Sequence, residues 1–219
     1  METREIQTTK LHEHLVRMYG DQNIESRTFI GTFKRASETS RDIEGIAAVV
    51  NRKTQIGWYD EIIKPGAFSG VLDASDIRAL LNHDPNHLLA RKRAKNDSGI
   101  TDTLETWIDD AGNFRYGFSV PNSRDDILEM VERGDLAESS FAFTLDSYTW
   151  EMEDSRDLRV IEKFKRIYDV APATYPAYQD TTVAKRSFDA LSDEVKDTKS
   201  AQAELKKRGR LLFLFNHKF

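Results

Sequence analysis

Short runs of apolar, β-branched and aromatic residues alternate with turn-forming residues along the central part of the chain. Runs of this length and composition are typical of β-strands, and the positions between them favour tight turns. One turn is Asp110-Ala111-Gly112-Asn113, whose residue types tolerate the positive φ of a hairpin. The pattern predicts strand pairs over residues 43–50 with 56–63, 104–109 with 114–120, and 140–150 with 158–168.

Two stretches favour helices instead. The first covers residues 73–81, DASDIRALL, and ends before His83. The second has Ser123 as a candidate N-cap and Gly134 as a candidate stop, since glycine readily adopts a left-handed conformation. Few helices among many strands predict an α+β fold that is mainly β.

The two ends of the chain have a different character from the centre. Residues 1–26 are polar with a weak helical pattern, and we expect a flexible arm there. Residues 186–219 begin with a highly charged segment whose apolar residues have nearly heptad spacing, which predicts a helical tail that binds a partner. Residues 27–185 are therefore predicted to form one domain between these two extensions.

Composition narrows the classes of function. The chain has 219 residues, a net charge of −5 and no cysteine, so disulfides, thiol catalysis and thiolate metal sites are excluded. It has no apolar stretch of membrane-spanning length and no signal-peptide pattern at its start. Without a dominant basic stripe we expect neither nucleic-acid nor membrane binding, and we expect a soluble cytoplasmic protein.

Ser140 is the candidate nucleophile. In SSFAFTL, Ser140, Ala142 and Thr144 alternate with Phe141 and two further apolar residues, so a strand would present small polar residues on one face. A serine becomes nucleophilic when a base lies nearby. On these residues alone, an ordinary surface serine at a strand end is the simpler interpretation.

His83 is the candidate base, because an imidazole that titrates near neutral pH in a fixed turn suits proton transfer. Asp84-Pro85 follows it and turns the chain. His87 raises the alternative of a metal site, but Pro85 breaks the helix that would align the two imidazoles. We predict no metal and no other cofactor.

Five further segments carry recognisable motifs: Gly45–Val50, IIKPGAFSGVL (62–72), NHDPN followed by Leu89-Ala90-Arg91, GDLAESSFAF (134–143) and YDVAPATYPAYQDT (168–181). Together they resemble one family, the prohead proteases that mature the capsids of tailed phages. The resemblance spans about residues 43–184 and has alanine where the family usually has glycine, at Ala90 and Ala142.

The resemblance assigns Ser140 the role of nucleophile, with Ser139 as the less favoured neighbour, and His83 the role of base. For the third member we predict Asp169, which would lie across the second long hairpin from Ser140 if the loop centres near Asp154. Glu105 is the alternative, and Glu138 is a weaker one. Arg91, or less favourably Arg93, is the candidate for oxyanion or substrate binding.

The resemblance implies a serine endopeptidase with the fold of the herpesvirus assemblins, a mostly antiparallel β-barrel flanked by a few helices. It also implies the substrates, namely the scaffolding region of the major capsid protein and the protease itself, inside the prohead in the host cytoplasm. Self-association is left open. Two alternatives remain: a non-catalytic capsid assembly module acting through its C-terminal helix, and a metal-assisted hydrolase using His83 and His87.

Overall fold

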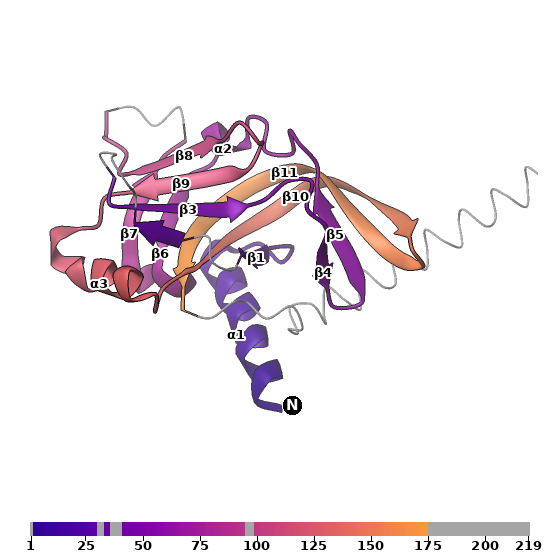
Figure 1. The fold of residues 1–219 in the computed structure, drawn as a ribbon, viewed down its shortest axis with the longest axis horizontal. Coiled ribbons are helices and arrows are strands. Elements are labelled where there is room, and N and C mark those ends of the chain that lie inside the picture. The colour runs from indigo at the N-terminus through magenta and orange to yellow at the C-terminus, as the bar shows by residue number, and fades with distance from the viewer. Residues whose placement is uncertain (1, 30–32, 36–40, 95–98, 175–219) are drawn as a thin grey trace, which may run out of the picture.

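The computed structural model describes residues 2–29, 33–35, 41–94 and 99–174 (Figure 1). They form a mainly β fold with a few helices, as predicted. The larger sheet has the order β1 (Glu25–Phe29), β10 (Glu138–Glu153), β11 (Arg156–Ala173), β5 (Tyr59–Ile63), β4 (Thr54–Ile56), with β6 (Ile77–Leu80) between β11 and β7 (Leu88–Lys92). The smaller sheet has the order β2 (Phe33–Arg35), β3 (Ile43–Ala48), β9 (Phe114–Phe118), β8 (Leu104–Ile108). The helices are α1 (Glu2–Tyr19), α2 (Val71–Ala74) and α3 (Asp125–Arg133), with single 3-10 turns η1 (Leu81–His83), η2 (Pro85–His87) and η3 (Asn122–Arg124).

Strands β10 and β11 form one long hairpin that runs through the molecule (Figure 1). Its turn lies at Asp154 and Ser155, both with positive φ, so the expected loop position is confirmed. The expected register is wrong, because β-bulges between Ala142 and Tyr148 insert more residues into β11 than into β10. Ser140 therefore lies opposite Ala171 rather than residue 168, and Asp169 lies opposite Ala142.

The alternation predicted for β10 is confirmed. Phe141 and Phe143 point into the main core, where they meet Phe68, Phe114 and Phe164. Ser140 and Ala142 alternate with these phenylalanines and so lie on the opposite face of the strand. That face carries the candidate site.

The helix expected over residues 73–81 is wrong in most of its length. Helix α2 ends at Ala74, and Ile77–Leu80 form β6. β6 pairs with β11 in parallel, with Arg78 opposite Asp169, and its alternate residues Ile77 and Ala79 are fully buried. Sheet pairing here overrides a local pattern that fits a short helix equally well.

The predicted pairing of residues 43–50 with 56–63 is also wrong, since the two segments belong to different sheets. β3 pairs with β2 and β9, whereas β5 forms a short hairpin with β4 around Gly57 and runs parallel to β11. In contrast, the predicted hairpin of β8 and β9 is confirmed, with Gly112 at positive φ in its turn.

Helix α3 occurs where it was predicted. Gly134 ends it in the left-handed conformation, with its N–H bonded to carbonyls of the last turn. The cap at its start differs from the expectation, because Arg124 is the N-cap residue and no side chain caps the helix; Ser123 lies in η3.

The N-terminal segment, expected to be a flexible arm over residues 1–26, contains α1 and the start of β1. Leu15 of α1 and Ile24 after it are buried in a second cluster with Ala142 and Tyr168. The weak apolar pattern of this segment is therefore sufficient to dock one helix face on the hairpin. The predicted tail over residues 186–219 lies outside the described residues.

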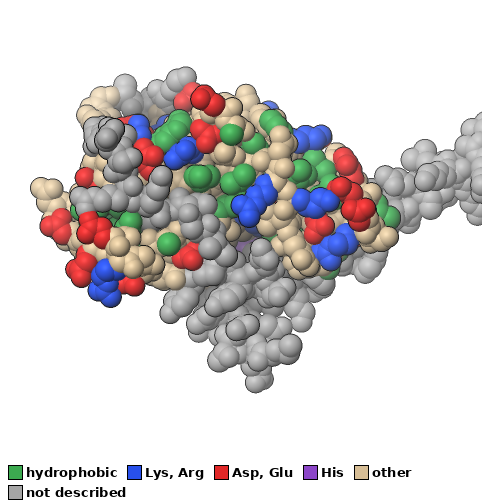
Figure 2. All heavy atoms as spheres, in the orientation of Figure 1, with side chains coloured by type: hydrophobic (Ala, Val, Ile, Leu, Met, Phe, Trp, Pro, Cys, Tyr) green, Lys and Arg blue, Asp and Glu red, His purple; other side chains and the backbone are tan. Residues whose placement is uncertain are grey.

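The surface mixes charges of both signs. Figure 2 shows acidic and basic side chains close together at two ends of the visible face, over α3 and over the tip of the β10–β11 hairpin. Arg124 pairs with Asp126 at 2.9 Å beside α3, for example. Within the described part of the chain, none of the helices combines the length and the apolar character that a membrane crossing requires.

Candidate active site

Ser140 lies near the start of β10, just after the chain leaves α3. Gly134 stops the helix and the fully buried Leu136 anchors the connection, so the strand begins at a fixed place. The side chains of the two adjacent serines point in opposite directions. Ser139 Oγ is 2.9 Å from Tyr116 Oη of the smaller sheet, whereas Ser140 Oγ faces His83.

His83 ends η1, which follows β6. Both Asn82 and His83 have positive φ, an uncommon backbone conformation that neighbouring contacts must hold in place. The side chain of Asn82 accepts hydrogen bonds from the N–H and hydroxyl of Thr174, and Asp84 accepts one from the N–H of Asn86. The imidazole of His83 is thereby fixed on the face of the sheet that carries Ser140.

Asp169 completes a hydrogen-bonded relay. His83 Nε2 is 2.8 Å from Ser140 Oγ, and His83 Nδ1 is 2.7 Å from Asp169 Oδ1. With Asp169 as a carboxylate, Nδ1 carries the proton and Nε2 is left to accept the serine proton. The three residues are 1% (Ser140), 3% (His83) and 0% (Asp169) exposed, so water competes little for these bonds.

Two groups that the sequence analysis did not single out also touch this relay. The hydroxyl of Tyr19, at the end of α1, donates to Asp169 Oδ2 at 2.7 Å. The backbone carbonyl of Arg27 in β1 lies 3.0 Å from Ser140 Oγ and is a second acceptor for its proton. No local sequence pattern identifies either group, because both act across long sequence separations.

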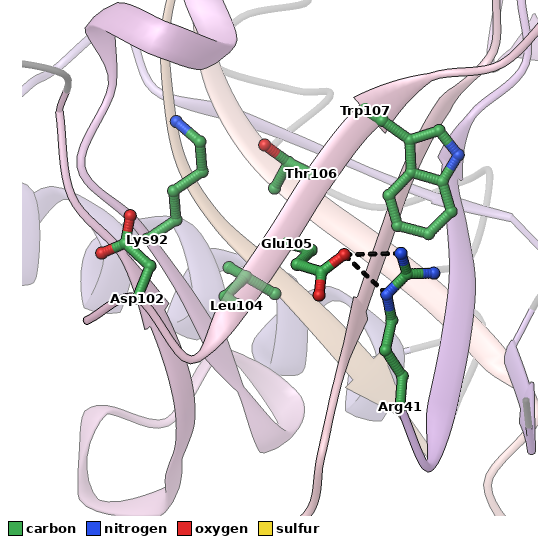
Figure 3. Close-up of a pocket in the computed structure, with 7 residues that line it drawn as sticks. All are labelled: Arg41, Lys92, Asp102, Leu104, Glu105, Thr106 and Trp107. Carbon is green, nitrogen blue, oxygen red and sulfur yellow. Dashed lines mark hydrogen bonds and ion pairs between the residues drawn. The ribbon is translucent and has the colours of Figure 1, made fainter. Parts of the chain in front are cut away.

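Glu105, the alternative third member, lies elsewhere. It projects from β8 of the smaller sheet and accepts a hydrogen bond from Arg41 Nε at 2.8 Å. Figure 3 shows this pair facing each other beside Trp107. These three residues help to line a cavity of about 470 Å³. The guanidinium of Arg41 also lies over the Trp107 ring, 4.5 Å from its centroid. The structure therefore brings Asp169, and not Glu105, to His83.

The arginines that follow the histidine segment are held by carboxylates. Arg91 of β7 donates from Nε and Nη2 to Asp76, at 2.9 and 2.5 Å, and these bonds hold the pKa of Asp76 below its usual value. Arg93 pairs with Asp102 at 3.3 Å. Arg91 lies one strand beyond Arg78, which itself lies opposite Asp169.

His87 does not join His83 in a cluster of metal ligands. Its side chain is half exposed, and its Nε2 lies 3.9 Å from Asp84 Oδ2. Among the described residues there is no group of three or more His, Asp or Glu side chains arranged to hold a metal ion.

The two alanines that depart from the usual glycines are both buried. Ala90 lies in β7 opposite Ala79. Ala142 packs beneath α1 with Leu15 and Tyr168, so its methyl group fills space against the helix rather than entering the relay.

A serine, a histidine and an aspartate bonded in this order define the class of site found in serine hydrolases. Comparison with protein families agrees and is more specific: the model of the family described as Caudovirus prohead serine protease matches residues 31–194, most of the chain. The chain therefore belongs to this family of serine peptidases. Searches of curated proteins and of solved structures give no match.

Proposed function

We propose that this protein is the endopeptidase of prohead maturation, with Ser140 as nucleophile, His83 as general base and Asp169 as the group that orients His83. The observation that supports these roles most strongly is the continuous relay from Ser140 Oγ through the imidazole to Asp169 Oδ1. Membership of the prohead protease family supports the reaction class.

The first half of the reaction cleaves the peptide bond. His83 Nε2 takes the proton of Ser140 as Oγ attacks the carbonyl carbon of the substrate, which gives a tetrahedral oxyanion. His83 then gives that proton to the leaving amine, and the C–N bond breaks to leave an acyl-enzyme. Asp169 accepts the Nδ1–H bond throughout and stabilises the positive charge on the imidazolium.

The second half releases the acyl group. His83 takes a proton from water, the hydroxide oxygen attacks the ester, and the proton returns to Ser140 Oγ as the ester bond breaks. The oxyanion needs hydrogen-bond donors in both halves. Arg91 remains our candidate for this role or for substrate binding, because it closely follows the histidine segment in the sequence and its guanidinium is a planar hydrogen-bond donor.

The substrates that we propose are the scaffolding region of the major capsid protein and the chain itself. Cleavage would take place inside the assembling prohead in the host cytoplasm, and self-cleavage would fall in the segment over residues 186–219. The assemblin-like barrel and self-association also remain predictions: in the described residues the strands pair into two sheets, and no closed barrel is found.

Co-expression with a capsid protein that carries its scaffolding region tests the proposal. We expect Ser140→Ala to abolish processing of the capsid protein and of the protease, measured by mass spectrometry of both chains. Ser139→Ala is the matched control, since it removes the neighbouring hydroxyl, which is bonded to Tyr116 and not to His83. Undiminished processing by Ser140→Ala would refute the assignment and would favour a non-catalytic assembly role.

A further inference from the structure

The aspartate of the relay has two carboxylate oxygens, and each has a different partner. Oδ1 accepts from His83 Nδ1, and Oδ2 accepts from the hydroxyl of Tyr19 at 2.7 Å. Asp169 is fully buried, so an oxygen without a partner would be costly. Tyr19 therefore supplies the hydrogen-bond donor for Oδ2, the carboxylate oxygen that does not bind the imidazole.

Tyr19 is held in place by packing as well as by this bond. Its ring lies against that of Tyr168, with centroids 4.6 Å apart, and the buried Leu15 of the same helix packs in the same cluster. Burial, followed by the nearby charge of Asp169, raises the pKa of Tyr19 far above its ordinary value. The phenol therefore keeps its proton and acts as a permanent donor.

The same helix makes a second contact with the site. His14, just over one turn before Tyr19, has Nε2 3.0 Å from the backbone carbonyl of His83. That carbonyl belongs to a residue with positive φ, whose conformation depends on its neighbours. Helix α1 thus contacts both the residue that supplies the base and the residue that orients it.

We infer that Tyr19 is a fourth, positioning residue of the active site, which fixes the carboxylate of Asp169 in the orientation that His83 requires. This inference rests on the catalytic roles proposed above. Tyr19 precedes residues 31–194, the part of the chain that matches the family. The residue that positions Asp169 therefore lies outside the region that the chain shares with the family. With the hydroxyl removed, the carboxylate would be free to rotate about its Cβ–Cγ bond and the imidazole would lose its fixed partner.

Tyr19→Phe tests this inference because it removes one oxygen and keeps the ring. We expect kcat to fall by about 10- to 100-fold, the range for loss of a hydrogen bond to a charged group, with KM unchanged. We also expect the low-field proton NMR signal of His83 Nδ1–H to shift and to exchange faster with water. This second measurement needs no substrate.

Tyr168→Phe is the matched control. It removes the other hydroxyl of the same aromatic pair, which donates to Asp21 at 2.8 Å and does not touch the relay. We expect it to keep the wild-type kcat and the wild-type His83 signal. If Tyr19→Phe behaves like Tyr168→Phe in both measurements, the inference is overturned and α1 contributes packing alone.

Failure of the proposed function and failure of the inference about Tyr19 give different results. A wild-type protein that cleaves no capsid substrate would refute the proposed function, while the NMR comparison would still decide the role of Tyr19. If Tyr19→Phe does not fold, 3-fluorotyrosine at position 19 keeps the hydroxyl and makes it a stronger donor. The His83 signal should then shift in the folded protein, and an unchanged signal would overturn the inference.

Discussion

At the scale of single residues, the decisive feature is that Asp169 is buried and that each of its carboxylate oxygens accepts a hydrogen bond. Its bond to His83 Nδ1 selects the tautomer in which Nε2 is free to accept the proton of Ser140. An asparagine at this position can present its amide N–H to the imidazole instead of an oxygen, which favours the other tautomer.

Asp169→Asn is therefore expected to lower kcat by about 10⁴-fold, as loss of the correct tautomer does in other serine proteases, with little change in fold. Glu105→Gln is the control, because Glu105 pairs with Arg41 on the other sheet and should leave the cleavage rate unchanged. The measurement is the initial rate of capsid-protein cleavage. Loss of activity in Glu105→Gln with retention in Asp169→Asn would reverse our choice of the third member.

The sequence was sufficient to propose Ser140, His83 and Asp169, because each lies in a segment that resembles a known family. Asp169 was reached through a hairpin register that is itself wrong, since the bulges of β11 were not visible in the sequence. Tyr19 could not be found, because its contact with Asp169 spans 150 residues and no local pattern marks it.

At the scale of elements, helix α1 packs on the face of β10 and β11 that carries the site. Leu15 and its neighbours in the helix contact Ala142 and Tyr168. Because Leu15 is only 1% exposed, truncating it would leave a cavity between the helix and the sheet.

Leu15→Ala is expected to lower the free energy of unfolding by about 2–4 kcal/mol, the usual cost of a buried leucine truncation. It should also lower activity, since α1 carries Tyr19. Glu13→Ala, on the exposed side of the same helix, should change stability by less than about 0.5 kcal/mol. Urea unfolding of the two purified variants measures their free energies of unfolding. Equal stability of Leu15→Ala and Glu13→Ala would show that α1 is not packed on the hairpin.

The elements that were predicted correctly are those whose ends carry their own signals. Gly112 marks the turn of the β8–β9 hairpin, and Gly134 marks the end of α3. The elements that were predicted wrongly depend on distant partners. Ile77–Leu80 became a strand because β11 and β7 lie on either side of it, and nothing within the segment itself required this.

At the scale of the whole molecule, a largely buried cluster of four charged side chains links three strands through ion pairs. Arg159 of β11, with no exposed surface, bonds to Glu25 of β1 and Glu61 of β5, and Arg27 of β1 bonds to the same two carboxylates. Arg27 also supplies the carbonyl that contacts Ser140. The cluster therefore stabilises the strand beside the nucleophile.

Because of this cluster, we expect the free energy of unfolding to decrease at acid pH. Burial alone would raise the pKa of Glu25, but the charges of Arg159 and Arg27 outweigh it and lower the pKa from 4.5 to about 2. A carboxylate with a lowered pKa in the folded state stabilises the fold above its unfolded pKa. This contribution, on the order of 3 kcal/mol, is therefore lost as the pH falls from about 4.5 to about 2.

Urea unfolding at several pH values between 7 and 2 measures this dependence. Glu25→Gln should be less stable than the wild type at pH 7, and its stability should fall less steeply below pH 4.5. Asp146→Asn is the control, since Asp146 forms an exposed pair with Lys163 and should keep the wild-type pH dependence. The same acid dependence in Glu25→Gln and the wild type would contradict the assignment.

The order in which the site residues occur along the chain has a consequence for synthesis. Tyr19 and His83 are made early, Ser140 follows, and Asp169 lies in β11, the last strand that the structure describes. Since β11 pairs with β10, β5 and β6, the larger sheet cannot be completed around the site while β11 is still in the ribosome. With the roles proposed above, a nascent chain therefore holds its serine and histidine without their carboxylate, and we expect it to be inactive until β11 has left the ribosome.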